Sequence, residues 1–193
     1  MGGDGNDLLD GGAGADRLDG GAGWDHLFGR GGNDSIWDPD GGQAFGGAGN
    51  DSVYAVGDWD ERGEELQVVS GGAGKDIVGL VLTGRESLAV MQGGAGQDIF
   101  AIHGSVASTV WEGAHIDDFR PGFDRLALRF DVDTSFGVFD TNQDGVLTGA
   151  DAPAADTGAY IYEGSEQECL MLDIGNTHIT LQGVQVLRPE DFV

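Results

Sequence analysis

A nine-residue repeat constrains this chain more than any other feature of its sequence. Four nonapeptides run without a gap through residues 2–37, each close to the pattern G-G-x-G-x-D-x-U-x, in which U is apolar. Four further copies, one of them shortened to eight residues, follow at 38–45, 46–54, 71–79 and 93–101. The eighth position is apolar in every copy, with Phe45 assigned to it in the shortened one. Because a flexible Gly/Asp linker keeps no such spacing, we expect a solenoid in which one side chain per repeat points inward.

The charge of the chain indicates that its partners are cations. The sequence has 34 Asp and Glu residues against 9 Lys and Arg residues, a formal net charge of -25. This charge disfavours binding to nucleic acid or to anionic lipid, and together with low mean hydropathy it keeps a chain unfolded unless something neutralises it. No apolar run approaches the roughly 20 residues that a membrane-spanning helix needs. The single cysteine, Cys169, is expected to be a small buried hydrophobic residue, since one cysteine cannot form an intramolecular disulfide.

The repeat resembles the RTX (hemolysin-type) calcium-binding repeat, which shares its glycines, its sixth-position aspartate and its apolar eighth position. The resemblance implies an all-β fold, a parallel β-roll in which six residues of each repeat turn and three form a strand. It also implies Ca²⁺ ions between successive turns on the same side of the roll. The residue types suit that role, because glycine allows a positive φ in tight turns and carboxylate oxygens suit a hard cation.

The sixth-position aspartates divide between two sides of the roll, here called side A and side B. Side A begins with Asp7 and Asp25, after which Gln43 is expected to replace the carboxylate. We interpret the stretches 55–70 and 80–92 as long replacements of single half-turns on side A. Side B then continues unbroken through Asp16, Asp34, Asp51, Asp76 and Asp98. Four gaps on side B and one on side A predict about five Ca²⁺ ions, which would change the formal charge from -25 to about -15.

The resemblance further implies that backbone carbonyls of the turns complete each ion site. On side B these carbonyls belong to the first and third positions of the repeats, namely Gly11, Ala13, Gly29, Gly31, Gly46, Ala48, Gly71, Ala73, Gly93 and Ala95.

Glycine becomes rarer after residue 101, so we expect a calcium-binding roll over 1–101 and a C-terminal capping and secretion-signal domain over 102–193. Residues 115–130 resemble the segment that closes the β-roll of serralysin-type metalloproteases, although Ala114 stands where that pattern begins with an aspartate. Downstream segments alternate polar and apolar residues, and Gly175-Asn176 is a two-residue hairpin signal. An antiparallel β cap is therefore expected.

Residues 140–151 form a second candidate calcium site, one of EF-hand type. The carboxylate, amide and hydroxyl groups, with one backbone carbonyl from Val146, fall at the positions of an EF-hand loop. The ligands would be Asp140, Asn142, Asp144, Val146, Thr148 and Asp151. The alternative is a turn that its Asx side chains stabilise without metal.

The sequence shows no catalytic pattern: it has neither H-E-x-x-H nor G-x-S-x-G, and its four histidines share no metal-ligand spacing. We expect this chain to be no enzyme, but the calcium-binding tail of a larger secreted protein whose preceding domain holds the chemistry.

The expected function is a calcium-binding module that is exported by type I secretion machinery and folds outside the cell. Glu190–Val193 resembles the uncleaved C-terminal signal of that route, and its removal is expected to block export while sparing folding. The alternative is an accessory module that binds an extracellular polysaccharide or surface through the stretches 55–70 and 80–92.

Overall fold

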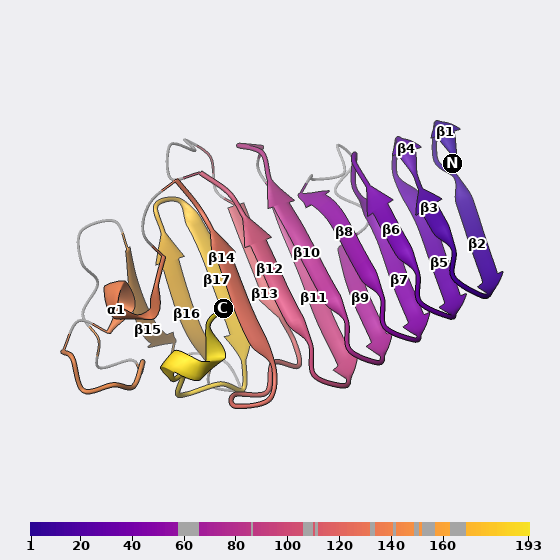
Figure 1. Cartoon of the computed structure of the whole chain (residues 1–193). Helices are drawn as coiled ribbons and strands as arrows, with labels where there is room; N and C mark the ends of the chain where they lie inside the picture. The colour runs from indigo at the N-terminus through magenta and orange to yellow at the C-terminus, as the bar shows by residue number, and fades with distance from the viewer. Residues whose placement is uncertain are drawn as a thin grey trace.

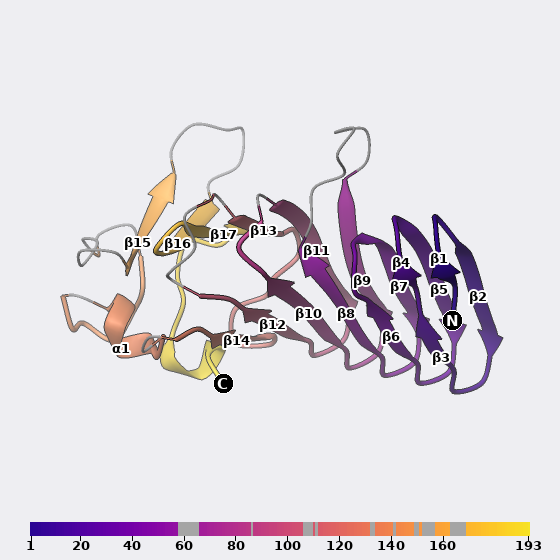
Figure 2. The same cartoon turned by 90° about the horizontal axis from the view of Figure 1, so that it is seen from above.

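The computed structural model describes residues 1–57, 66–85, 87–105, 110, 112–131, 134–140, 142–148, 151, 157–162 and 169–193. They form a parallel β-solenoid with an antiparallel cap, which confirms the expected fold class (Figure 1). Two sheets face each other along the molecule, and the cap lies at the end far from the N-terminus (Figure 2).

One sheet consists of six parallel strands in the order β14-β12-β10-β8-β6-β3. Each strand pairs in register with the strand one coil away, so that Val53 lies beside both Ile36 and Val78. The strands are β3 (Arg17–Asp19), β6 (Ser35–Asp38), β8 (Ser52–Gly57), β10 (Ile77–Leu82), β12 (Ile99–His103) and β14 (Arg125–Arg129).

The facing sheet has nine strands in the order β15-β16-β17-β13-β11-β9-β7-β5-β2. The parallel part comprises β2 (Leu8–Ala13), β5 (Asp25–Gly31), β7 (Gly42–Ala48), β9 (Gln67–Ala73), β11 (Ser87–Ala95), β13 (Glu112–Ile116) and β17 (Thr177–Gln182). β16 (Cys169–Ile174) and β15 (Thr157–Tyr162) continue the sheet in antiparallel order. A separate small pair joins β1 (Gly3–Asp4) to β4 (Gly21–Ala22).

The core between the sheets is built from the eighth-position side chains, as the repeat predicts. Leu27, Val53, Val78 and Phe100 have no solvent exposure. The shortened copy departs from the expectation: Ala44 pairs with Leu27 and is buried, whereas Phe45 pairs with Phe28 and stacks on it with ring centroids 5.2 Å apart. Because this copy lacks one residue, its register shifts by one, and Ala44 rather than Phe45 takes the inward position.

The parallel ladder passes through residue 101 without interruption, because β12 spans it and β14 pairs with β12. Beyond β14, the short helix α1 (Phe136–Phe139) and the 3-10 turn η1 (Pro189–Asp191) pack beside the end of the roll. Cys169 is buried, as expected, and the hairpin between β16 and β17 turns at Gly175-Asn176. None of the helices within the described ranges is long and apolar enough to cross a membrane.

Candidate metal centre

Side B of the roll is a column of aspartates in turns that lead from the nine-stranded sheet into the six-stranded one, along the lower edge in Figure 1. The backbone N–H of each aspartate donates to Oδ1 of the aspartate one coil further on. The distances are 2.8 Å for Asp16 to Asp34, 2.7 Å for Asp34 to Asp51, 2.8 Å for Asp51 to Asp76 and 3.0 Å for Asp76 to Asp98. The column on side B is therefore continuous from Asp16 to Asp98, although the stretches 55–70 and 80–92 intervene in the sequence.

The second oxygen of these carboxylates lacks a partner. Oδ2 of Asp16, Asp34, Asp51 and Asp76 is buried and accepts no hydrogen bond from any residue that the structure describes. Asp34, Asp51 and Asp76 are at most 3% exposed. A buried carboxylate oxygen without a hydrogen bond or counter-charge is strongly unfavourable. A cation bound beside each of these atoms would stabilise it.

The first-position glycines leave an oxygen-lined space beside each orphaned atom. A Cβ added to Gly29 would lie 2.4 Å from Asp34 Oδ2 and 2.5 Å from the carbonyl oxygen of Gly46 in the next turn. A Cβ added to Gly46 would lie 2.5 Å from both Asp51 Oδ2 and the carbonyl oxygen of Gly71. Any larger residue would fill this space, and carboxylate and carbonyl oxygens are the ligands that Ca²⁺ prefers. The residues present therefore fit calcium.

The third-position carbonyls each accept a backbone hydrogen bond from the preceding coil. The oxygens of Gly31, Ala48, Ala73 and Ala95 accept the N–H of the fourth-position residue in the preceding coil, at 2.7–2.8 Å. Since a carbonyl oxygen has two lone pairs, this bond leaves one for a metal. Across the described ranges, no three His, Cys, Asp or Glu side chains converge on one point, so an ion here would draw its remaining ligands from backbone carbonyls.

The carboxylates of the column perturb one another when no cation is present. Burial raises the pKa of Asp76 to about 6, with a further contribution from the charges of Asp51 and Asp98. Burial also raises the pKa of Asp51, beside Asp34. A divalent cation bound beside these carboxylates would offset both shifts, because its charge stabilises the ionised form.

The far end of the column is closed by the chain's own cation. The Asp98 N–H donates to Oδ1 of a sixth aspartate, Asp124, at 3.1 Å. The Arg120 guanidinium bonds to both oxygens of Asp124 and to the Gly96 carbonyl, and lies 3.3 Å from Asp98 Oδ2. Sequence analysis missed this closure because Arg120 and Asp124 lie outside the repeats.

This closure makes the aspartates unequal. Asp51 borders two gaps whose carboxylates have orphaned oxygens, whereas the outer side of Asp98 already contacts Arg120. We expect Asp51→Asn to raise the Ca²⁺ concentration at the folding midpoint about tenfold, ~1.4 kcal/mol, and Asp98→Asn to raise it about threefold. Far-UV circular dichroism of the two variants during Ca²⁺ titration measures the difference. Equal shifts would contradict the assignment of the gaps.

Side A begins in the same way but continues differently from the expectation. The Asp7 N–H donates to Asp25 Oδ1 at 2.8 Å, and Oδ2 of each lacks a partner among the described residues. In the next coil Gly42 stands opposite Asp25, and Gln43 stands opposite His26. Gln43 therefore does not replace the carboxylate, because the shortened copy moves it by one position.

In the EF-like loop, aspartate side chains accept hydrogen bonds from the loop's own backbone. Both oxygens of Asp140 accept backbone N–H groups, from Asp144 at 3.2 Å and from Gly145 at 3.1 Å. Asp151, 1% exposed, accepts the Thr148 N–H at 2.9 Å. Leu147, at the eighth loop position, forms an antiparallel bridge with Leu187. The other expected ligands, Asn142 and Val146, lie on the same loop, with Asn142 exposed and Val146 half-buried.

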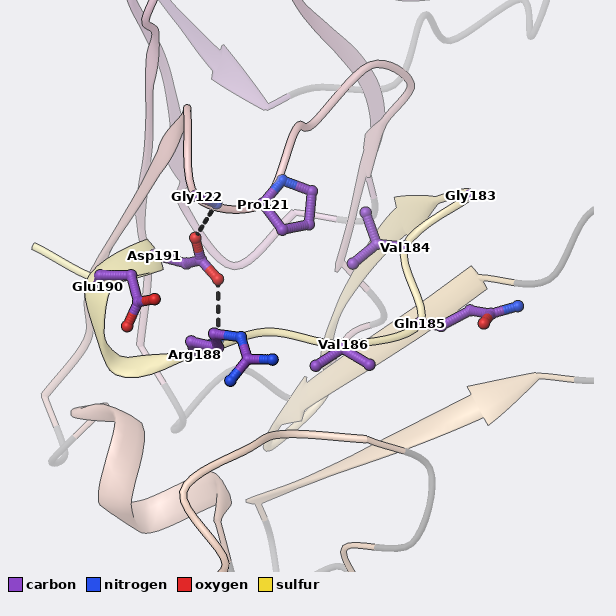
Figure 3. A pocket seen from close by; sticks show the side chains of 9 residues that line it. All are labelled: Pro121, Gly122, Gly183, Val184, Gln185, Val186, Arg188, Glu190 and Asp191. Carbon is purple, nitrogen blue, oxygen red and sulfur yellow. Dashed lines mark hydrogen bonds between the residues drawn. The ribbon is translucent and has the colours of Figure 1, made fainter.

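The last residues are part of the folded cap. Asp191 is fully buried, and its carboxylate accepts the N–H groups of Gly122 and Arg188 beside a pocket (Figure 3). The Phe192 ring lies 5.6 Å from that of Phe136, and the Val193 N–H donates to the Leu126 carbonyl. These contacts argue against the expectation that removing Glu190–Val193 spares folding, because removal would take away the buried Asp191 carboxylate, which bonds to Gly122, and the Phe192 ring that packs on Phe136.

Comparison with known proteins bears on the N-terminal part of the chain. The model of the RTX calcium-binding nonapeptide repeat matches residues 1–36 and 43–60 as four copies. No curated protein matches the chain. Among solved structures, the solution structure of the AlgE6R3 subunit from the Azotobacter vinelandii mannuronan C5-epimerase is similar at 20% sequence identity and a TM-score of 0.33, over 100% of this chain and 80% of that chain.

Proposed function

We propose that this chain, which carries RTX calcium-binding repeats over residues 1–36 and 43–60, is a module that folds on binding Ca²⁺ outside the cell. Type I secretion machinery would export it unfolded, as the C-terminal part of a larger secreted protein. The cytosol keeps calcium submicromolar, whereas extracellular modules bind it at roughly 10⁻⁴–10⁻³ M. The same chain would thus stay unfolded during export and fold on arrival.

The observation that carries this proposal is the column of buried carboxylate oxygens without partners. Asp34, Asp51 and Asp76 each bring one such oxygen to the same edge of the roll. The chain has a formal charge of -25, so divalent cations bound at this edge would reduce its self-repulsion, and its 9 Lys and Arg side chains are too few to neutralise its acidic residues. Calcium would supply the positive charge, and the aspartates and the first- and third-position carbonyls would hold the ions.

Equilibrium dialysis with Ca²⁺ at millimolar concentration and pH 7.5 tests the proposal. We expect at least five ions per chain, and far weaker binding of Mg²⁺, which demands compact octahedral geometry and gives up its water reluctantly. A chain that binds no Ca²⁺, or binds Mg²⁺ equally well, would contradict the proposed function.

The EF-like loop is proposed to bind one further ion independently of the roll, because its ligands lie within twelve residues. Asp144→Ala is expected to reduce the bound count by one and to change the Ca²⁺ midpoint of roll folding less than twofold. Dialysis and circular dichroism on the same variant measure the two quantities. An unchanged ion count would favour the turn without metal.

The alternative of a polysaccharide- or surface-binding module rests on the stretches 55–70 and 80–92. Residues 58–65 and 86, which include Trp59, the single aromatic residue of the two stretches, lie outside the described residues. The polysaccharide- or surface-binding function therefore stays an expectation from the sequence. Under both alternatives the catalytic chemistry is assigned to a preceding domain.

A further inference from the structure

The shortened repeat on side A has moved its carboxylate from the sixth position to the first. Asp19 pairs with Trp37, so the next residue, Asp38, stands level with Gly20, the first residue of the preceding side-A turn. At the sixth position, level with Asp25, stands Gly42, which has no side chain. A standard copy has the reverse arrangement, with glycine first and aspartate sixth.

A side chain at the first position must point into the ion space. A Cβ added to Gly20 would lie 2.3 Å from Asp25 Oδ2, and one added to Gly2 would lie 2.5 Å from Asp7 Oδ2. Asp38 follows this direction: its Oδ2 lies 2.7 Å from the position of a Cβ added to Gly42. An oxygen of the Asp38 carboxylate thus lies beside the sixth position, where Gly42 provides no side chain.

The Asp38 carboxylate is buried, with the Asp40 backbone N–H as a nearby donor. Asp38 has no solvent exposure, and neither of its oxygens meets hydrogen-bond geometry with a residue in the described part of the chain. The Asp7 N–H donates to the carboxylate of Asp25 in the next coil. The Asp25 N–H donates instead to the Gly41 carbonyl, at 3.3 Å. The Asp38 carboxylate can therefore still accept a cation, and Asp25 contributes its own orphaned Oδ2 to the same gap.

The charges around this gap are negative. Asp19, Asp25 and Asp40 all raise the pKa of Asp38, which burial, the largest cause, brings to about 8. Arg85 approaches Asp40 to 3.7 Å at the surface, where the Arg85 side chain is 61% exposed and that of Asp40 is 44% exposed. At the end of side B, Arg120 contacts both Asp98 and Asp124, whereas the ion pair of side A joins Arg85 to the exposed Asp40.

We infer that Asp38 replaces the missing sixth-position carboxylate and, with Asp25 and turn carbonyls, holds a second Ca²⁺ ion on side A. This inference rests on the proposed function, since it adds one ion to the same calcium-binding edge. Oxygen donors, two carboxylates and a backbone rich in glycine suit Ca²⁺ rather than a softer metal, which would call for histidine or cysteine ligands. The repeat pattern alone misses this site because it assigns carboxylate ligands to the sixth position.

Ion counting on the full chain tests the inference. We expect Asp38→Asn to bind one Ca²⁺ ion fewer than the unmodified chain in equilibrium dialysis at pH 7.5. Asp10→Asn is the matched control, because it removes the same charge from a side chain that is 53% exposed and paired with Arg30; its ion count should not change. An unmodified chain without bound Ca²⁺ would overturn the proposed function, whereas a calcium-binding chain whose count Asp38→Asn leaves unchanged would overturn this inference alone.

A second pair of variants keeps the test decisive if Asp38→Asn does not fold. Asp25 borders both side-A gaps, the one shared with Asp7 and the one shared with Asp38, whereas Asp7 borders the first gap. Asp25→Asn is therefore expected to lose two ions and Asp7→Asn one. Equal losses would mean that the Asp25/Asp38 gap holds no metal.

Discussion

In excess chelator at pH 7.5 the chain is expected to give the far-UV circular dichroism spectrum of a largely unfolded polypeptide, and millimolar Ca²⁺ is expected to convert it cooperatively to β structure. The physical reason is the column of buried carboxylates, whose Oδ2 atoms have no protein partner within the described residues. The free energy of metal binding contributes directly to the free energy of folding when the site exists in the folded state alone. Each site contributes about 2.7 kcal/mol when Ca²⁺ is at about 100 times its Kd, so several sites together are comparable with the whole stability of a typical domain.

The pH dependence of the ion-free chain provides an internal check with a defined sign. The folded-state pKa of Asp76 is raised by burial from 3.8 to about 6, so the folded form binds protons more tightly than the unfolded form in that interval. The free energy of unfolding therefore falls as pH rises from about 4 through 6. Residual β structure in chelator should be greater at pH 5 than at pH 7.5. A chelated chain with full β structure at pH 7.5, unchanged by Ca²⁺, would show that the turns do not need the metal.

The repeat predicts the regular part of the fold because its information is local. Each glycine, aspartate and apolar residue has a fixed place in a nine-residue unit, so the spacing alone is enough to place Val53 and Val78 in the core and Asp51 and Asp76 in one column. The antiparallel cap was predictable for a similar reason, because alternation and the Gly175-Asn176 turn are local signals.

The features that sequence analysis missed depend on where the repeat is broken. The eight-residue copy can be aligned with the repeat in two ways. Placing Phe45 at the eighth position puts Gln43 at the sixth, whereas in the structure Ala44 takes the inward eighth position. Arg120 could not be assigned to the end of side B because its contact with Asp98 joins residues 22 positions apart, in a segment outside the repeat. Both depend on how one coil stacks on the next, which no single repeat specifies.

Deleting residues 102–193 is expected to raise the Ca²⁺ concentration needed to order the repeats by at least tenfold. The deletion removes β13 and β14, which pair with β11 and β12, together with the last two residues of β12. It leaves β11 and the rest of β12 as open edges. It also removes Phe119, whose ring centroid lies 5.8 Å from that of the buried Phe100. Exposing a large buried apolar side chain costs about 1.5–3 kcal/mol, and capless repeat arrays are destabilised at their open end.

The position of the cap's own C-terminus provides a graded control for that deletion. Removing Glu190–Val193 takes away Asp191 and the Phe192 contact but leaves β13 and β14 paired with the roll. Its Ca²⁺ midpoint should therefore lie between those of the full chain and the large deletion, with circular dichroism as the measurement for all three. If the large deletion orders its repeats at the same Ca²⁺ concentration as the full chain, the roll needs no cap. Calcium between the coils would then be sufficient to hold the last coil closed against water.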